Sequence, residues 1–227
     1  MLFPAPSAVI FDCDGVLVDS EILAIEVETD MLAALGLHYD LPTFRARFLG
    51  MHDVAFRDAL DADRRALHGV GLPADFLTET QARRRAAVDD RLVEVVGARR
   101  AVETLTAPKA VASSTGAAFL ERKLRKTTLW DLFAPHAYSA DLVARGKPAP
   151  DIFLHAAHAL GVAPAHCLAI EDSANGVAAA RAAGMRVWGF TGGGHCGAET
   201  AGALRAAGAD DVLATWAAAE RHFARLA

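Results

Sequence analysis

Short apolar runs alternate with helical patterns over most of the chain. The runs end in polar or glycine-rich residues, and they predict strands at 8–11, 109–112, 136–139, 167–170, 187–190 and 211–213. Between and after them, helical periodicity predicts helices that include 116–126, 152–160, 174–183 and 215–226. This alternation is typical of a parallel sheet covered by helices on both faces. We therefore expect an α/β fold, a Rossmann-like three-layer core with a parallel sheet.

One region departs from this rhythm. Residues 20–88 contain helical periodicity and no convincing strand, with Ile22, Ile25, Met31 and Leu35 marking a first helix. Gly36 follows as a helix stop, because glycine adopts the left-handed conformation that ends many helices. We expect an all-helical second domain at 20–88, inserted into a core made of 1–19 and 89–227.

Composition narrows the class of protein. The chain has 227 residues, 53% of them hydrophobic, and a net charge of −5, so we expect no nucleic-acid partner. Its three cysteines are too few and scattered for a disulfide framework, which favours a reduced cytoplasmic chain. The N-terminal segment lacks a signal-peptide pattern, and no apolar stretch is long enough for a membrane span. The oligomeric state stays open, and a monomer is compatible with the sequence.

The first predicted strand runs into two aspartates. Asp12 and Asp14 are two residues apart, which places them on the same side of an extended chain. Gly15 then permits a sharp turn. Adjacent like charges repel, so the pair calls for a cation, a shared proton or full hydration. A solvated strand end is the alternative for such a motif taken alone.

Other predicted strand ends carry complementary groups. Ser113 and Ser114 lie in the segment VASSTG, where hydroxyls and helix N-terminal amides can bind an anion or simply cap the helix. Lys147 precedes two prolines in a loop, where it is either solvated or placed to neutralise a phosphate. Glu171 and Asp172 end a further strand with hard oxygen ligands that suit Mg²⁺. Together these groups match the needs of phosphoryl transfer.

The chain thus resembles the haloacid dehalogenase superfamily, in the branch with a helical cap that includes β-phosphoglucomutase and sugar-phosphate phosphatases. The motifs FDCDGVLVDSE, VASST, GKPAPD and IEDSANG carry the resemblance in the family's order. It implies a small phosphorylated substrate and the following roles. Asp12 is the nucleophile that forms an aspartyl-phosphate, Asp14 the general acid and base, and Lys147 the charge-neutralising cation. The phosphoryl group is held by Ser113 and by the backbone amides from Ser114 onward. Mg²⁺ is bound by Asp12, Asp14 (through its main-chain carbonyl), Glu171 and Asp172.

The resemblance leaves several activities to separate. Ala24 stands where the mutase has a histidine, and Asp53 where it has a phosphate-binding arginine, which favours a phosphatase over a β-phosphoglucomutase-like mutase. A catalytically silent regulatory protein is a distant alternative, because every motif residue is present. His52 lies in a cap loop, where it either contacts substrate or is solvated. The glycine run at 192–194, ahead of His195, predicts a flexible loop.

Overall fold

A computed structural model describes residues 5–48, 51 and 53–226. Its residues form two compact units, a core unit made of Met1–Glu21 and Leu92–Ala227 and a helical unit made of Ile22–Arg91. Each unit has its own core of buried apolar side chains. No helix in the described part of the chain is both long and apolar enough to cross a membrane.

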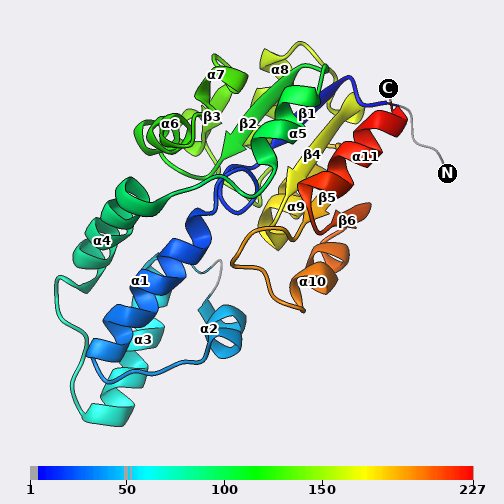
Figure 1. Cartoon of the computed structure of the whole chain (residues 1–227). Helices are drawn as coiled ribbons and strands as arrows, with labels where there is room; N and C mark the ends of the chain where they lie inside the picture. The colour runs from blue at the N-terminus through cyan, green and yellow to red at the C-terminus, as the bar shows by residue number, and fades with distance from the viewer. Residues whose placement is uncertain (1–4, 49–50, 52, 227) are drawn as a thin grey trace. The chain divides into compact units, whose positions relative to one another are not determined.

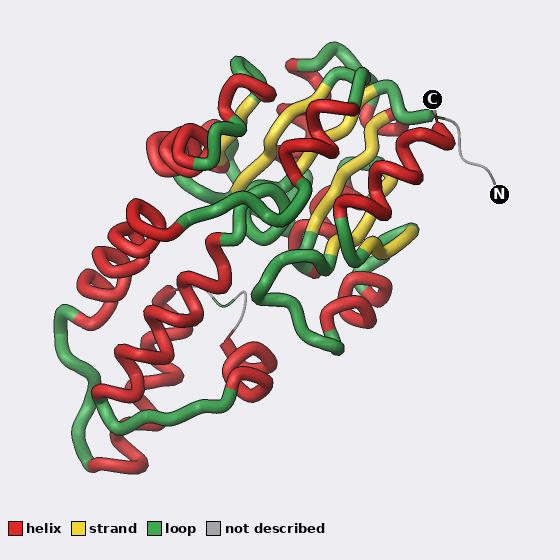
Figure 2. Tube along the Cα trace, in the orientation of Figure 1, coloured by secondary structure: helices red, strands yellow, loops and turns green. Residues whose placement is uncertain are grey.

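The core unit is built on a six-stranded parallel sheet, which confirms the predicted fold class (Figure 1). Its order is β3-β2-β1-β4-β5-β6. The strands are β1 (Ala8–Phe11), β2 (Lys109–Ser113), β3 (Ala137–Ser139), β4 (Cys167–Glu171), β5 (Arg186–Phe190) and β6 (Asp211–Leu213). All six predicted strands are present, with ends within one residue of the prediction. In Figure 2 these strands run side by side through the core unit.

Helices cover both faces of this sheet, as an alternating pattern requires. The helices of the core unit are α5 (Ala98–Thr104), α6 (Ala117–Lys126), α7 (Trp130–Phe133), α8 (Asp151–Ala159), α9 (Ala174–Ala182), α10 (Thr200–Ala206) and α11 (Trp216–Leu226), with short 3-10 turns η1 (Ala140–Leu142) and η2 (Pro164–His166). Helix α1 (Ser20–Ala34) begins in this unit and continues into the other.

The side chains of the central strand show how the two faces are filled. Ile10 faces the cluster formed with α8, α9 and α10. Phe11 faces the other way, where its ring lies 5.6 Å from Phe133 and 5.8 Å from Trp216. Every residue of β1 is fully buried, which is why this strand reads as a continuous apolar run.

The helical unit contains most of α1 together with α2 (Leu41–Phe48), α3 (Asp53–His68) and α4 (Phe76–Arg91). Its core is rich in aromatic rings, with Phe44 close to both Phe48 and Phe56. Gly36 has φ +78°, a left-handed conformation that favours glycine, and it ends the first helix as predicted.

Candidate active site

The polar groups predicted at the strand ends meet at the carboxyl edge of the sheet. Asp12 follows β1, and Ser113 and Glu171 are the last residues of the two neighbouring strands, β2 and β4. Phe11 is in register with Val111 on one side and Ile170 on the other. The three strands therefore end level with one another, and parallel pairing brings their terminal side chains together.

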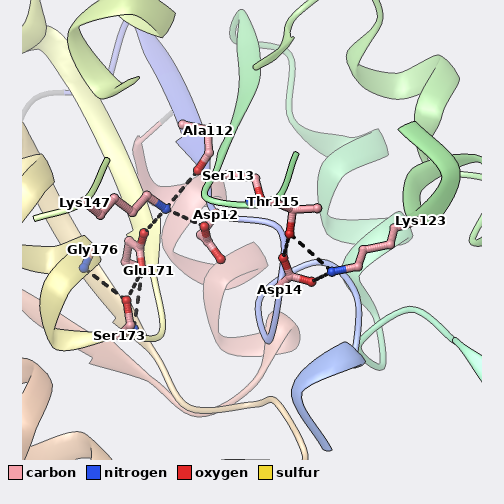
Figure 3. Close-up of polar contacts among 10 residues, drawn as sticks. All are labelled: Asp12, Asp14, Ala112, Ser113, Thr115, Lys123, Lys147, Glu171, Ser173 and Gly176. Atoms are coloured by element: carbon pink, nitrogen blue, oxygen red, sulfur yellow. Dashed lines mark hydrogen bonds and ion pairs between the residues drawn. The ribbon is translucent and has the colours of Figure 1, made fainter. Parts of the chain in front are cut away.

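Lys147 joins two of these strand ends through its ammonium group (Figure 3). Its Nζ donates to Asp12 Oδ1 and Glu171 Oε1, each at 2.5 Å, and to the main-chain carbonyl of Ala112 at 2.9 Å. All three hydrogens of the ammonium thus have acceptors. The side chain is only 6% exposed, so the cation acts in a region largely shielded from water.

Burial dominates the ionisation of this group of residues. It raises the pKa of Asp12 to about 7, because the nearby Lys147 cation offsets only part of the desolvation and Glu171 adds like charge. The pKa of Glu171 is raised as well, chiefly by burial and against the effect of Lys147. Burial alone would lower the pKa of Lys147, but the two carboxylates outweigh it and raise that pKa.

Three buried carboxylates form a cluster of a kind that binds metal ions. Asp12, Glu171 and Asp172 each offer an oxygen, and these oxygens lie within 4.8 Å of one another. Carboxylate oxygens are hard ligands of the type that Mg²⁺ prefers. Burial raises the pKa of Asp172 too, and the like charge of Asp12 raises it further. Such shifts are expected where several buried carboxylates lie together with fewer cations than anions. The donor set therefore fits a divalent cation.

The side chain of Asp14 has partners of its own, separate from those of Asp12 (Figure 3). It accepts hydrogen bonds from the hydroxyls of Ser20 and Thr115, the latter at 2.7 Å, and forms an ion pair with Lys123. Burial alone would raise the pKa of Asp14, but the Lys123 cation and these hydrogen bonds hold it below its usual range. Each aspartate of the motif thus has its own lysine.

The segment at the end of β2 carries Ser113 and Ser114, the residues predicted to bind the phosphoryl group. Ser113 is fully buried, and its hydroxyl oxygen accepts from the Thr115 amide at 3.0 Å, which leaves its own hydrogen available to a ligand. Ser114 is exposed. Gly116 is the N-cap residue of α6, and among the described residues no side chain of Ser114 or Thr115 caps this helix. Asp141 instead accepts from the Ala117 amide at 2.7 Å.

Three residues singled out in the cap, His52, Asp53 and Ala24, are left as predictions. His52 lies outside the described residues, so its predicted substrate contact stays a prediction. Asp53 begins α3, and Ala24 lies within α1. The comparison with a mutase made at these two positions stays a prediction as well.

Sequence reasoning missed Lys123. It stands between Leu120 and Leu124 on the buried face of α6, and its side chain is 7% exposed. The signal in the sequence was a lysine at an apolar position of the helix. Such a lysine is expected to have an anionic partner, because an unpaired charge is rarely buried.

His195 was also missed. The preceding glycines indicate only a loop, yet the side chain is 4% exposed and its Nε2 lies 3.2 Å from Asp172 Oδ2. Burial alone would lower the pKa of this histidine, but its contacts with Asp172 and Cys196 raise it to about 11. No sequence pattern pairs this loop with Asp172, since the contact depends on how β4 and β5 lie side by side.

Comparisons with known proteins identify the family. A family model described as haloacid dehalogenase-like hydrolase matches residues 6–184. The chain is 31% identical over 187 residues to 6-phosphogluconate phosphatase of Escherichia coli (strain K12), covering 81% of each chain.

Solved structures agree with this assignment. A haloacid dehalogenase-like protein of unknown function from Agrobacterium tumefaciens has a TM-score of 0.88 at 38% identity, covering 96% of this chain and 97% of the other. A HAD family hydrolase from Deinococcus radiodurans, with bound phosphate and sodium, has a TM-score of 0.84 at 36% identity, covering 96% and 94%. The protein belongs to the haloacid dehalogenase-like hydrolase family. Membership and the phosphatase relative support the predicted enzyme class, a phosphoric monoester hydrolase.

Proposed function

We propose that this protein is a Mg²⁺-dependent phosphatase that hydrolyses a small phosphorylated metabolite, a sugar phosphate or similar phosphomonoester, through an aspartyl-phosphate on Asp12. The observation that carries the proposal is the buried Asp12 carboxylate after β1, held by Lys147 beside two further carboxylates, Glu171 and Asp172, at the end of β4. The relative named 6-phosphogluconate phosphatase supports a sugar phosphate as the class of substrate.

The acidic cluster is the proposed metal site. Asp12, Glu171 and Asp172 would hold Mg²⁺ through side-chain oxygens, and Asp14 through its main-chain carbonyl. When bound, the cation reduces the repulsion between an anionic nucleophile and an anionic substrate. Lys147 contributes a second positive charge, because its ammonium group pairs with both Asp12 and Glu171. This charge lowers the electrostatic cost of bringing a phosphate to Asp12.

The chain's own residues then account for both halves of the reaction. Asp12 attacks phosphorus, the bond from phosphorus to the substrate oxygen breaks, and Asp14 gives that oxygen a proton. In the second half Asp14 takes a proton from water, the water oxygen attacks the phosphorus of the aspartyl-phosphate, and the bond from phosphorus to Asp12 breaks. Inorganic phosphate then leaves, and the Asp12 carboxylate is restored. The lowered pKa of Asp14 favours its ionised form, which the second half requires. Proton donation in the first half requires Asp14 to take up a proton from solvent before it donates, and separation from Lys123 favours this uptake because that cation lowers the pKa of Asp14.

Phosphoryl binding falls to the end of β2. The buried hydroxyl of Ser113 has a hydrogen left to donate to a phosphate oxygen, and amides from Ser114 onward add further donors. The exposed side chain of Ser114 has a smaller part in this proposal than its amide.

Phosphate release tests the proposal. Purified protein is assayed against a panel of phosphorylated metabolites with Mg²⁺ and with EDTA, beside Asp12→Asn and the exposed control Asp131→Asn. We expect metal-dependent release that Asp12→Asn abolishes and Asp131→Asn leaves unchanged. Release by Asp12→Asn near the wild-type rate would refute the nucleophile. No release from any compound would favour the mutase, tested next with hexose 1-phosphates plus a bisphosphate primer.

A further inference from the structure

The loop that follows β5 carries a buried histidine that the proposed reaction does not use. His195 Nε2 lies 3.2 Å from Asp172 Oδ2, and the Sγ atom of Cys196 lies 3.4 Å from the same nitrogen. The other ring nitrogen, Nδ1, is buried and has no hydrogen-bond partner among the residues that the structure describes. A histidine retained only for packing would gain from pairing both nitrogens, because an unpaired buried donor or acceptor costs free energy. This ring instead uses the nitrogen that faces Asp172.

Two glycines leave the space that this contact needs. Gly15 has φ +75°, and a Cβ added there would lie 1.8 Å from Asp172 Oδ2 and 2.5 Å from His195 Cε1. A Cβ at Gly193 would lie 2.8 Å from His195 Nδ1. Gly15 stands directly after the aspartate motif, so the backbone of the catalytic loop and the histidine ring enclose the Asp172 carboxylate together.

Hydrogen bonds donated by two main-chain amides of the loop hold it in this place. The Gly194 amide donates to Asp19 Oδ1 at 2.9 Å, and the Cys196 amide donates to the Gly193 carbonyl at 3.0 Å. The first bond ties the loop after β5 to the segment after β1. The position of His195 is thus set by the same part of the sheet edge that sets the carboxylate cluster.

We infer that His195 is a positioning residue, which holds the carboxylate of Asp172 in the orientation that binds the metal ion. Its Nε2–H donates to one carboxylate oxygen, which stops the group from rotating and leaves the other oxygen for a cation. Hydrogen-bond partners of metal ligands commonly have this effect, and losing one lowers metal affinity about 10–100-fold. The inference rests on the metal site of the proposed function.

Two substitutions of nearly equal size separate positioning from packing. Gln places a side-chain N–H where the imidazole Nε2–H lies, whereas Met fills similar space without a donor. Mg²⁺ alone is titrated into the full-length protein by calorimetry, with no substrate present. We expect His195→Met to weaken Mg²⁺ binding about 10–100-fold, and His195→Gln to stay within about threefold of wild type.

His222 supplies the matched control. Its Nε2 lies 3.5 Å from Asp211 Oδ2, a second histidine–aspartate contact, whose aspartate lies outside the acidic cluster. His222→Met should leave Mg²⁺ affinity unchanged. If His195→Met binds Mg²⁺ as wild type does, or if Met and Gln weaken binding equally, the positioning role is wrong.

A measurement on the wild-type protein covers the case in which the variants do not fold. The ring nitrogens of His195 are followed by nitrogen-15 NMR during a Mg²⁺ titration, and we expect the Nε2 signal to shift as Asp172 takes up the cation. An unchanged signal at saturating Mg²⁺ would overturn the inference. Wild-type protein that binds no Mg²⁺ would instead refute the proposed metal site itself, and Mg²⁺ binding without phosphate release would count against the proposed hydrolysis alone.

Discussion

Removal of the Lys123 cation should destabilise the core unit strongly. The Lys123–Asp14 ion pair is largely shielded from water, with side chains 7% and 15% exposed. Lys123→Met keeps the length and apolar contacts of the side chain but leaves the Asp14 charge, among the described residues, with the hydroxyls of Ser20 and Thr115 as its side-chain partners. Breaking a buried ion pair by removing one partner costs about 3–5 kcal/mol. In a chain of this size 1 kcal/mol lowers Tm by about 2–4 °C, so we expect a fall of roughly 6–20 °C.

A double-mutant cycle measured by differential scanning calorimetry tests the cause. Asp14→Asn removes the uncompensated charge, so the double variant Lys123→Met/Asp14→Asn should melt above Lys123→Met alone. Arg125→Met is the matched control on the same helix. It breaks an exposed pair with Glu121, whose partners are 56% and 45% exposed, and should cost no more than about 1 kcal/mol. A Lys123→Met protein as stable as wild type, or penalties that simply add in the double variant, would refute this reasoning.

Three further changes have definite expected results. Gly176→Ala would place a Cβ 2.0 Å from the carboxyl carbon of Glu171, so Mg²⁺ affinity measured by calorimetry should fall at least about tenfold; an unchanged affinity would show that the carboxylate is not a ligand. Mg²⁺ binding should weaken as the pH falls below about 7, because burial raises the pKa of Asp12 to about 7 and a carboxylate must lose its proton to bind a cation. Calorimetry in buffers of different ionisation enthalpy should detect the released proton, and the absence of any release would contradict this. Phe44→Ala empties a buried position in the helical unit and should cost about 3–5 kcal/mol of its stability, seen as an earlier melting transition, whereas Arg83→Ala, in an exposed pair with Glu79 of the same unit, should cost no more than about 1 kcal/mol.

The strands and most of the core helices could be predicted because their signals are local. A strand buried on both faces must be apolar throughout, so β1 and β4 are visible as short runs bounded by polar residues. The left-handed stop at Gly36 is equally local, since only the backbone conformation at that residue requires glycine. The order of the strands in the sheet has no such local signature, and it follows from how the helices pack over both faces.

The candidate site also has some features that the sequence could predict and others that it could not. Asp12, Lys147 and Glu171 could be predicted to meet because parallel strands bring their carboxyl ends to one edge, and motif residues there share one location. The separate partners of Asp12 and Asp14 could not be predicted, because the alternation of a strand says nothing about which lysine packs against each carboxylate.

The sequence by itself determined the elements, the edge of the sheet at which polar groups gather, and the family. Only the tertiary structure decided that Lys123 pairs with Asp14 across 109 residues and that His195 is buried against Asp172. The physical reason is that hydrophobic periodicity depends on neighbours along the chain, whereas the pairing of buried charges depends on which elements meet in space. A buried charge must be paired because leaving it unpaired costs free energy, and the packing of the helices and strands determines which opposite charge lies close enough to pair with it.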